Sequence, residues 1–126
     1  RRKLKVKVST AAGPGLDWMV AKLVGKSYVK GDTDYAPDGR IYQRGTAQPT
    51  GPHYSTDWAQ GGPIIERERI CLEERKKMSV WLAYLRDVTT GESKVITYGP
   101  TPLIAACRCF VASKLGDEVE VPDELA

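Results

Sequence analysis

The feature that most constrains the fold is a segment late in the chain, residues 101–115, that is apolar on almost every side of a helix. Thr101 is suited to cap this helix, and Gly116 is suited to end it. Arg108 and Lys114 form only a narrow polar strip along it. Because a helix of this kind is buried on most sides, we expect it to be the most buried helix of the protein.

The region before this helix alternates in the manner of β-strands. Residues 70–75, 79–86 and 94–98 are each predicted as a strand. The middle segment is apolar on both faces, which is typical of a strand covered above and below. We therefore expect an α+β fold with a mainly antiparallel β-sheet over residues 70–98 and helices packed on both faces. Residues 4–8 also alternate and are expected to extend this sheet.

Two further helices are expected in the first half of the chain. An apolar stripe at helical spacing over residues 16–23 predicts the first, which should end at Gly25. Ser55 or Thr56 can cap the second. Pro63, which follows two glycines, is expected to kink that helix or to restart it as a new segment.

The net charge of +3 is concentrated at the ends of the chain. Residues 1–7 hold five basic side chains, and the rest of the chain has 14 basic against 16 acidic residues. Acidic residues crowd the C-terminal end. Because both end segments alternate and carry opposite charge, we expect Lys5 and Lys7 to lie near Glu118 and Glu120.

Length and composition favour one soluble domain over residues 1–126. No apolar run approaches the roughly 20 residues that a membrane-spanning helix needs, and the basic, alternating start is not that of a signal peptide. Residues 26–53 form an irregular excursion rich in glycine and proline. Within it, residues 37–39 suit a turn, so residues 28–29 and 41–42 are predicted to pair as a small hairpin.

No arrangement of residues predicts catalysis or metal binding. Cys107 and Cys109 are two apart in a helix and so point about 200° apart, which argues against a zinc site with Cys71 and His53. We expect buried thiols, no metal, no cofactor and no catalytic residue. Gly25-Lys26-Ser27 ends a helix and lacks the preceding glycine of a phosphate-binding loop, so it carries no nucleotide site.

The excursion is the predicted partner-binding site. Long loops on a rigid scaffold commonly carry binding, and Tyr and Arg are enriched at interface hot spots. The exposed start of the second helix is expected to supply a fixed aromatic anchor. The candidate contact residues are Tyr28, Tyr35, Arg40, Tyr42, Arg44, Tyr54, Asp57 and Trp58.

Two blocks of sequence, residues 54–68 and 99–117, together with Leu16-Asp17-Trp18 and Ala21-Lys22, carry a family resemblance. They resemble the NinX-like family of small bacteriophage and prophage proteins of unknown function. The resemblance implies an origin in a phage or prophage, the cytoplasm of a bacterial host and a phage α-β-α sandwich domain. It carries over no catalytic residue.

Three classes of function follow. The lack of a convergent catalytic set favours a non-enzymatic accessory protein that binds a host or phage protein. The first alternative is a protein that binds or hydrolyses a small molecule or nucleotide with the Gly/Pro-rich loop. The second is a nucleic-acid binder that uses the basic N-terminal arm. No membrane partner is expected.

Overall fold

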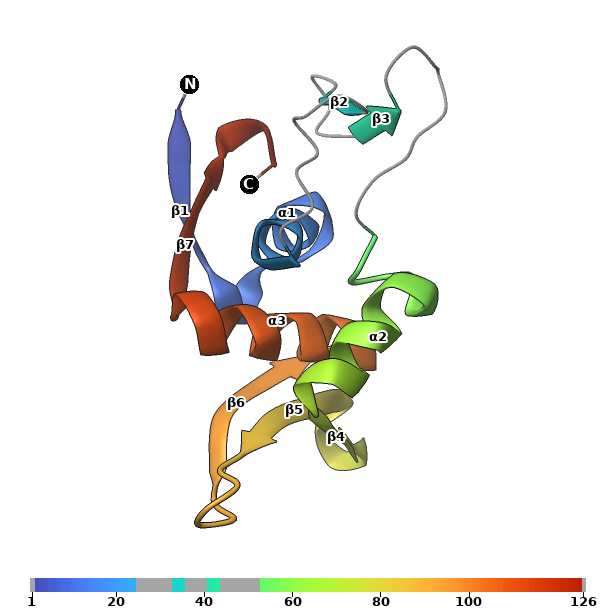
Figure 1. The fold of residues 1–126 in the computed structure, drawn as a ribbon, viewed down its shortest axis with the longest axis vertical. Coiled ribbons are helices and arrows are strands. Elements are labelled where there is room, and N and C mark those ends of the chain that lie inside the picture. The colour runs from blue at the N-terminus through green and yellow to red at the C-terminus, as the bar shows by residue number, and fades with distance from the viewer. Residues whose placement is uncertain (1, 25–32, 36–40, 44–52, 126) are drawn as a thin grey trace.

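The computed structural model describes residues 2–24, 33–35, 41–43 and 53–125 (Figure 1). Among these residues, none of the helices combines the length and the apolar character that crossing a membrane requires. In chain order the strands, α-helices and 3₁₀-helices (η) are β1 (Lys3–Lys7), η1 (Val8–Thr10), α1 (Gly13–Val24), β2 (Thr33–Tyr35), β3 (Ile41–Gln43), α2 (Trp58–Glu68), β4 (Cys71–Arg75), η2 (Lys76–Met78), β5 (Val80–Arg86), β6 (Ser93–Gly99), α3 (Pro102–Leu115), β7 (Glu118–Pro122) and η3 (Asp123–Leu125).

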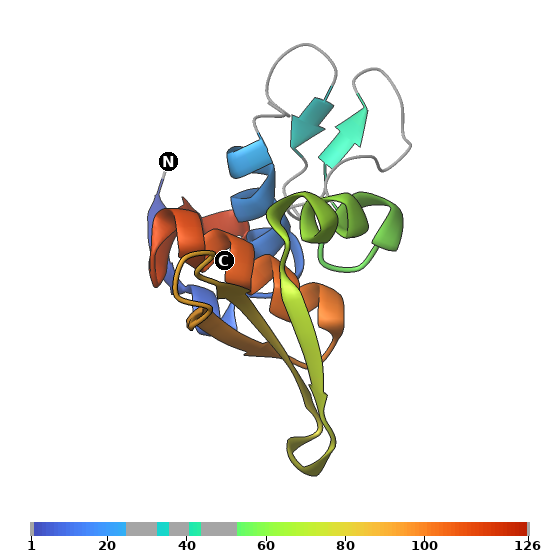
Figure 2. The ribbon, with the colours of Figure 1, turned by 60° about the horizontal axis from the view of Figure 1, so that its bottom comes forward.

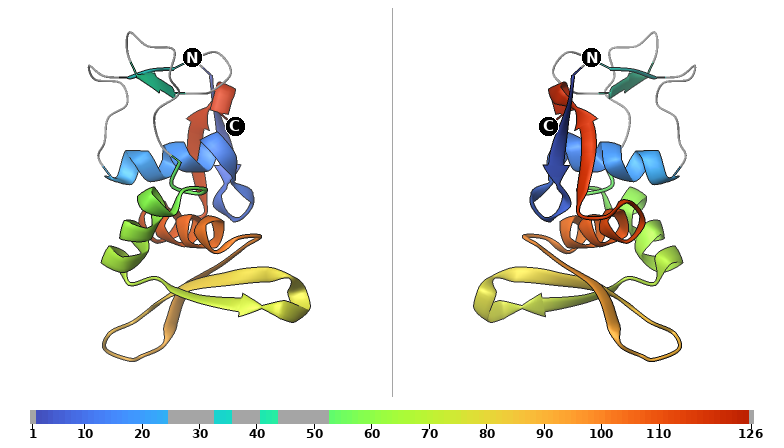
Figure 3. Two further views of the ribbon diagram at one scale, coloured as in Figure 1. Left: turned by 90° about the vertical axis from the view of Figure 1, so that its right-hand side faces the viewer. Right: turned by 90° about the vertical axis from the view of Figure 1, so that its left-hand side faces the viewer.

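Helix α3 is the central layer of the molecule. One side of it faces β4, β5 and β6, and the other side faces α1 and the pair β1–β7 (Figures 1 and 3). Thr101 caps it, since its Oγ1 accepts the N–H of Ile104 at 3.1 Å, and it ends at Gly116, whose φ is +87°. More of its residues are buried than in α1 or α2. Seven of the 14 residues of α3 and six of the 12 residues of α1 are buried, so the prediction that α3 is the most buried helix is confirmed against α2 but not against α1.

Strands β4, β5 and β6 form an antiparallel sheet in that order, close to the predicted boundaries. Small residues on the face toward α3 allow the helix to come close. A Cβ atom on Gly99 would lie 2.6 Å from the backbone nitrogen of Ala105, so only glycine fits at this position. Thr97 adds a hydrogen bond from its Oγ1 to the carbonyl oxygen of Ala105 at 2.9 Å.

The α+β class and the antiparallel sheet are confirmed, but the expected helical cover on both faces is wrong for the described residues. Helix α3 covers one face of the three-stranded sheet, and Figures 1 and 3 show no helix against the other. The physical reason lies in α3 itself. Because α3 is apolar on most sides, its far side also needs cover, and α1 packs there while α2 packs beside α3 (Figure 3).

Strand β1 does not extend the three-stranded sheet as predicted, because it pairs with β7 in a separate two-stranded antiparallel sheet. The predicted charge pairing is confirmed by the register, in which Lys5 stands opposite Glu120 and Lys7 opposite Glu118. The alternate residues of β7 are buried in the core beside α1. One face of this small sheet is therefore apolar and covered except at Leu4, which is 49% exposed, and the other is charged and open.

Helix α2 differs from the sequence prediction at its start. Asp57 is the N-cap, since its Oδ1 accepts the N–H of Ala59 at 2.9 Å. Ser55 and Thr56, the predicted caps, belong to the turn that precedes it. The backbone of this turn is engaged elsewhere, because the N–H of Ser55 donates to the Asp17 carboxylate.

The predicted restart of α2 as a new segment at Pro63 is wrong, because the helix runs continuously from Trp58 to Glu68 with Pro63 inside it, and a kink at Pro63 stays a prediction. Close packing of Gly61 holds this segment in place. A Cβ atom there would lie 2.4 Å from the carbonyl oxygen of Tyr54 and 2.6 Å from Leu103 Cδ2. Tertiary contact thus outweighs the local effect of the proline.

The predicted hairpin in the excursion forms with a different partner strand. Strand β3 contains the predicted residues 41–42, but it pairs with β2, so that Tyr35 stands opposite Ile41 and Thr33 opposite Gln43. Residues 28–29, the predicted partner, lie outside the described residues. Pairing about a turn at residues 37–39 is symmetric, which makes 33–35 and not 28–29 the natural partner of 41–43.

Candidate binding surface

The face of the three-stranded sheet that is turned away from α3, called here the outer face, is apolar. Strand alternation places Leu82 opposite Tyr98 and Tyr84 opposite Ile96 on this face, with Val80 beside them. Ile96 is 52% exposed and Tyr98 is 47% exposed, whereas Leu82, on the central strand, is only 5% exposed. Large side chains of the kind found in a core thus border on solvent.

Charged side chains flank the outer face. On β5 the Arg86 guanidinium lies 5.7 Å from the ring centroid of Tyr84 and donates a long hydrogen bond of 3.4 Å to its hydroxyl oxygen. This contact raises the pKa of Arg86. On β4, Glu73 stands opposite Leu82 and Arg75 stands opposite Val80. The Arg75 Nη1 and Glu73 Oε1 atoms are 3.7 Å apart, which makes an ion pair. An apolar centre with Tyr and Arg at its border is the composition of a protein-binding surface.

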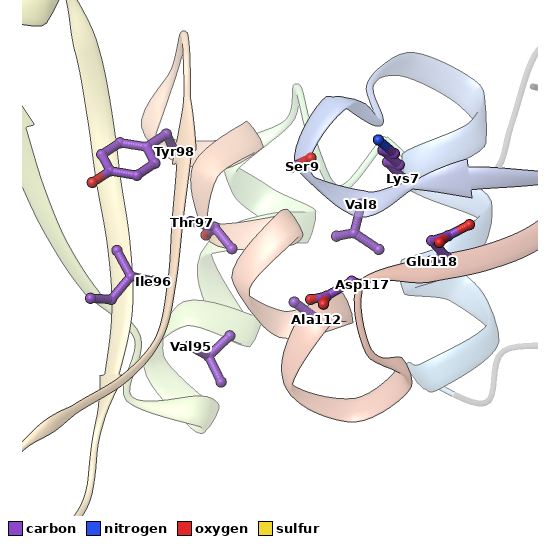
Figure 4. Close-up of a pocket in the computed structure, with 10 residues that line it drawn as sticks. All are labelled: Lys7, Val8, Ser9, Val95, Ile96, Thr97, Tyr98, Ala112, Asp117 and Glu118. Carbon is purple, nitrogen blue, oxygen red and sulfur yellow. The ribbon is translucent and has the colours of Figure 1, made fainter.

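A groove of about 630 Å³ runs along β6, and Figure 4 shows its lining. Residues 95–98 of β6 form one wall, and Lys7, Val8, Ser9, Asp117 and Glu118 face them across the end of α3, where Ala112 also lines it. We call this the β6 groove. It is continuous with the outer face, because Ile96 and Tyr98 belong to both.

The groove wall is built on hydrogen bonds that hold β6 against α3. Arg108, predicted only as part of a polar strip, donates from Nη1 to the carbonyl oxygen of Tyr98 at 2.8 Å and from Nε to that of Ala11 at 2.9 Å. The thiol of Cys109 lies 3.5 Å from the carbonyl oxygen of Val95. These contacts fix the position of β6 relative to the opposite wall.

Two acidic side chains, Asp117 and Glu118, and one basic side chain, Lys7, line the groove. Lys7 stands opposite Glu118 in the register of β1 and β7. The backbone of Asp117 is anchored, since its carbonyl oxygen accepts the N–H of Val8 at 2.8 Å. Within the described residues its carboxylate has no ion-pair partner. The Asp117 carboxylate is therefore exposed to solvent beside β6, where a bound group can reach it.

Five of the eight predicted contact residues belong to the excursion at residues 26–53. Tyr28, Arg40 and Arg44 lie outside the described residues. Tyr35 and Tyr42 are placed by their backbones in β2 and β3. The grouping of these side chains into one site therefore stays a prediction.

The other three predicted residues lie at the start of α2 but differ in exposure. Tyr54 is 5% exposed and belongs to the hydrophobic core, so it cannot serve as an exposed anchor. Asp57 is engaged as the N-cap. Trp58, at the first position of the helix, is 55% exposed, and it alone of the three presents a large apolar surface to solvent.

A buried contact that the sequence did not predict joins α1 to the turn before α2. Asp17 is 5% exposed and accepts the N–H of Ser55 at 2.8 Å. Burial raises the pKa of the Asp17 carboxyl, and the hydrogen bonds from Ser55 oppose that rise. No pattern in the sequence indicated this contact, because local sequence does not reveal a bond to a residue 38 positions away.

The thiols are placed as predicted, with Cys107 and Cys109 buried and Cys71 half-buried. Burial raises the pKa of the Cys107 thiol to about 12 and that of Cys109 to about 11, which disfavours the thiolate that a nucleophile or metal ligand requires. His53 is exposed, and its backbone N–H donates to Gln60 Oε1 at 2.7 Å. In the described part of the chain, no three His, Cys, Asp or Glu side chains gather as metal ligands.

One family of bacteriophage proteins matches most of this chain. The family model described as Bacteriophage P22, NinX matches residues 7–114. The chain belongs to this family. The NinX match covers α1, α2, the three-stranded sheet and almost all of α3, and it makes this a phage protein. A search of the curated proteins finds no match.

Proposed function

We propose that this member of the NinX family is a non-enzymatic accessory protein that acts by binding a host or phage protein. The observation that carries the proposal is the outer face of the three-stranded sheet. Ile96 and Tyr98 are each about half exposed on a face that also holds Leu82 and Tyr84. Contiguous apolar surface of this kind marks interaction sites in proteins.

The shape of the surface favours a protein over a small molecule. Figure 2 shows β4 and β5 extending well beyond the helices toward η2, and Met78 of η2 is 63% exposed. Small molecules bind in clefts that enclose most of their surface, whereas the outer face is broad and open. A large complementary surface is needed to cover it.

The two alternatives receive less support. Lys5 and Lys7 of the basic arm stand opposite Glu120 and Glu118, so part of the arm's charge is opposed within the molecule. This weakens the arm as a phosphate-binding patch. Binding or hydrolysis of a small molecule by residues 26–53 remains a prediction, which a ligand screen by thermal shift would test.

The tyrosine-rich excursion, with Trp58 beside it, is proposed as a second contact region for the same partner. Trp58 lies at the start of α2 and is 55% exposed. The place of action is the cytoplasm of the bacterial host, where a reducing environment suits the free thiols of Cys71, Cys107 and Cys109.

Capture experiments from infected host cells test the proposal with two matched charge substitutions. Ile96→Lys places an ammonium group on the outer face, where binding would bury it without a partner. Val88→Lys places the same group in the β5–β6 turn, where Val88 is 96% exposed. We expect the unmodified protein and Val88→Lys to retain a defined protein, and Ile96→Lys to lose at least tenfold of it. Equal capture by both variants, or none by the unmodified protein, would overturn the proposal.

A further inference from the structure

We propose that the β6 groove binds an extended peptide segment of the partner, which pairs as a short added strand with the outward backbone groups of β6 that α3 leaves unoccupied, around Ile96, and places a basic side chain beside Asp117. This inference rests on the proposed function, and it names the chemistry that the site recognises. Recognition by strand addition combines backbone hydrogen bonds for affinity with side-chain contacts at alternate positions for specificity.

The two edges of the three-stranded sheet differ in their protection. Exposed edges usually carry charged side chains that discourage pairing with another chain. Strand β4 fits this rule, since Glu73, Glu74 and Arg75 are followed directly by Lys76 and Lys77. Strand β6 has one lysine, at 94, and residues 95–98 are uncharged and of types favoured in strands. The edge with fewer charges is the one that lines the groove, and its protection is limited to the bulge at Val95 and to the Arg108 side chain on the carbonyl oxygen of Tyr98.

The dimensions of this edge suit a short segment. Residues 95–98 line the groove, but Val95 lies in the bulge, so the three residues 96–98 offer roughly 10 Å of edge at about 3.3 Å per residue. Register slips at the bulge between Tyr84 and Leu85, and Val95 has a φ of +48°, so regular pairing is expected to begin after this residue. The 630 Å³ volume lies within the range of ligand-binding clefts.

The opposite wall argues for a single extended segment and against a second copy of this chain. Ser9 and Asp117 face β6 across the groove (Figure 4). If the edge of a second copy paired with β6, the other strands of that copy would follow at about 4.8 Å intervals. They would then run into the opposite wall of the groove. One added strand needs only the space inside the groove. The open carboxylate of Asp117 then calls for a basic residue on that strand.

The probe for this inference is a library of random heptapeptides displayed on yeast and selected against the full chain. We expect the selected peptides to alternate apolar residues and to carry Lys or Arg at one shared position. When a synthetic peptide from this set is added, the outward backbone amides of Ile96 and Tyr98 should gain protection from hydrogen exchange, whereas that of Thr97, which points to β5, should not change. Asp117→Asn should lower its affinity several-fold at low salt and less at high salt.

Two tryptophan substitutions on η1 provide the matched control. Ser9 lines the groove and is exposed, so Ser9→Trp should fill the groove without disturbing the core. Thr10, its exposed neighbour, does not line the groove. We expect Ser9→Trp to lower peptide affinity at least tenfold and Thr10→Trp to leave it within twofold.

Three results would overturn the inference: no enrichment of peptides, peptide binding without protection of Ile96 and Tyr98, or equal affinity of the two tryptophan variants. Dimerisation that Ser9→Trp abolishes and that excludes the peptides would identify a second copy as the occupant instead. If any of these occurs while Ile96→Lys still loses the captured protein, the strand-addition inference fails and the proposed function stands.

Discussion

Two sheets in the described part of the molecule each turn one face to solvent, and the side chains on these two faces are of opposite character. In the β1–β7 sheet, Val119 and Val121 turn inward, and the outward positions pair Lys5 with Glu120 and Lys7 with Glu118. In the three-stranded sheet, the inward residues pack under α3, but the outward positions hold large apolar and aromatic side chains. Antiparallel sheets with one solvated face usually alternate apolar and polar residues, and only the first sheet follows that rule.

This difference teaches where the partner surface lies. The same chain builds a solvent-adapted face from charged pairs at one place, so the apolar outer face at the other is not a general feature of its sheets. Burial of an apolar side chain contributes about 25 cal/mol for each Å² removed from water. Covering Ile96 and Tyr98, both about half exposed, would release free energy that a charged face cannot supply.

The largest change in the free energy of unfolding is expected for a substitution in the buried helix α3, compared with a substitution on the outer face. Phe110 of α3 is 3% exposed, and Phe110→Ala should lower the free energy of unfolding by about 3–5 kcal/mol through the cavity that it leaves. Ile96→Ala on the outer face should cost only about 1 kcal/mol, since half of Ile96 is already in water. Urea unfolding measures both. Losses of equal size would show that the outer face is as buried as the core.

An intermediate effect is expected where the sheet meets α3. Gly99→Ala forces a methyl group against the backbone of Ala105 and should destabilise the fold by about 1–3 kcal/mol. Gly62→Ala is the control, because a Cβ atom there meets only Trp58 Cε3 at 3.9 Å within a helix. It should stabilise the protein by about 0.5–1 kcal/mol. A tolerated Gly99→Ala would mean that α3 does not cover the inner face so closely.

The smallest effect concerns the charged face. Reversing both lysines, Lys5→Glu and Lys7→Glu, places like charges opposite Glu120 and Glu118. Exposed cross-strand pairs are worth about 0.2–1 kcal/mol each, so the melting temperature should fall slightly at low salt. Because salt screens exposed charges, the loss should shrink at high salt. An equal loss of melting temperature at both salt concentrations would argue that these charges do not set the register of β1 and β7.

Sequence reasoning succeeded where the determinants are local. Thr101 and Gly116 bound α3 as predicted. Opposite charges at the two ends also predicted that Lys5 and Lys7 lie near Glu120 and Glu118, although not that β1 leaves the three-stranded sheet to pair with β7. It failed where two faces look alike. Residues 79–86 are apolar on both sides, so the pattern cannot tell the face under α3 from the face left open.

The candidate surface was missed for the same reason. Ile96 and Tyr98 were assigned to a predicted strand, but nothing local shows that no helix covers them. The prediction for Tyr54 was wrong in the opposite sense. A tyrosine beside a helix start resembles an exposed anchor, but long-range packing buries Tyr54. Both outcomes depend on contacts between distant segments. The one available signal was the contrast between a charged edge at 73–77 and an uncharged one at 95–98.

The pairing of β1 with β7 also bears on the order in which the chain folds. Strands β4, β5 and β6 are neighbours in sequence and can associate as soon as they are synthesised, whereas β1 must wait for β7. Contacts of such large sequence separation close late and slow folding. Until β7 emerges from the ribosome, α1 and the far side of α3 lack part of their cover. A nascent chain of this protein is therefore expected to hold its three-stranded sheet before its two ends meet.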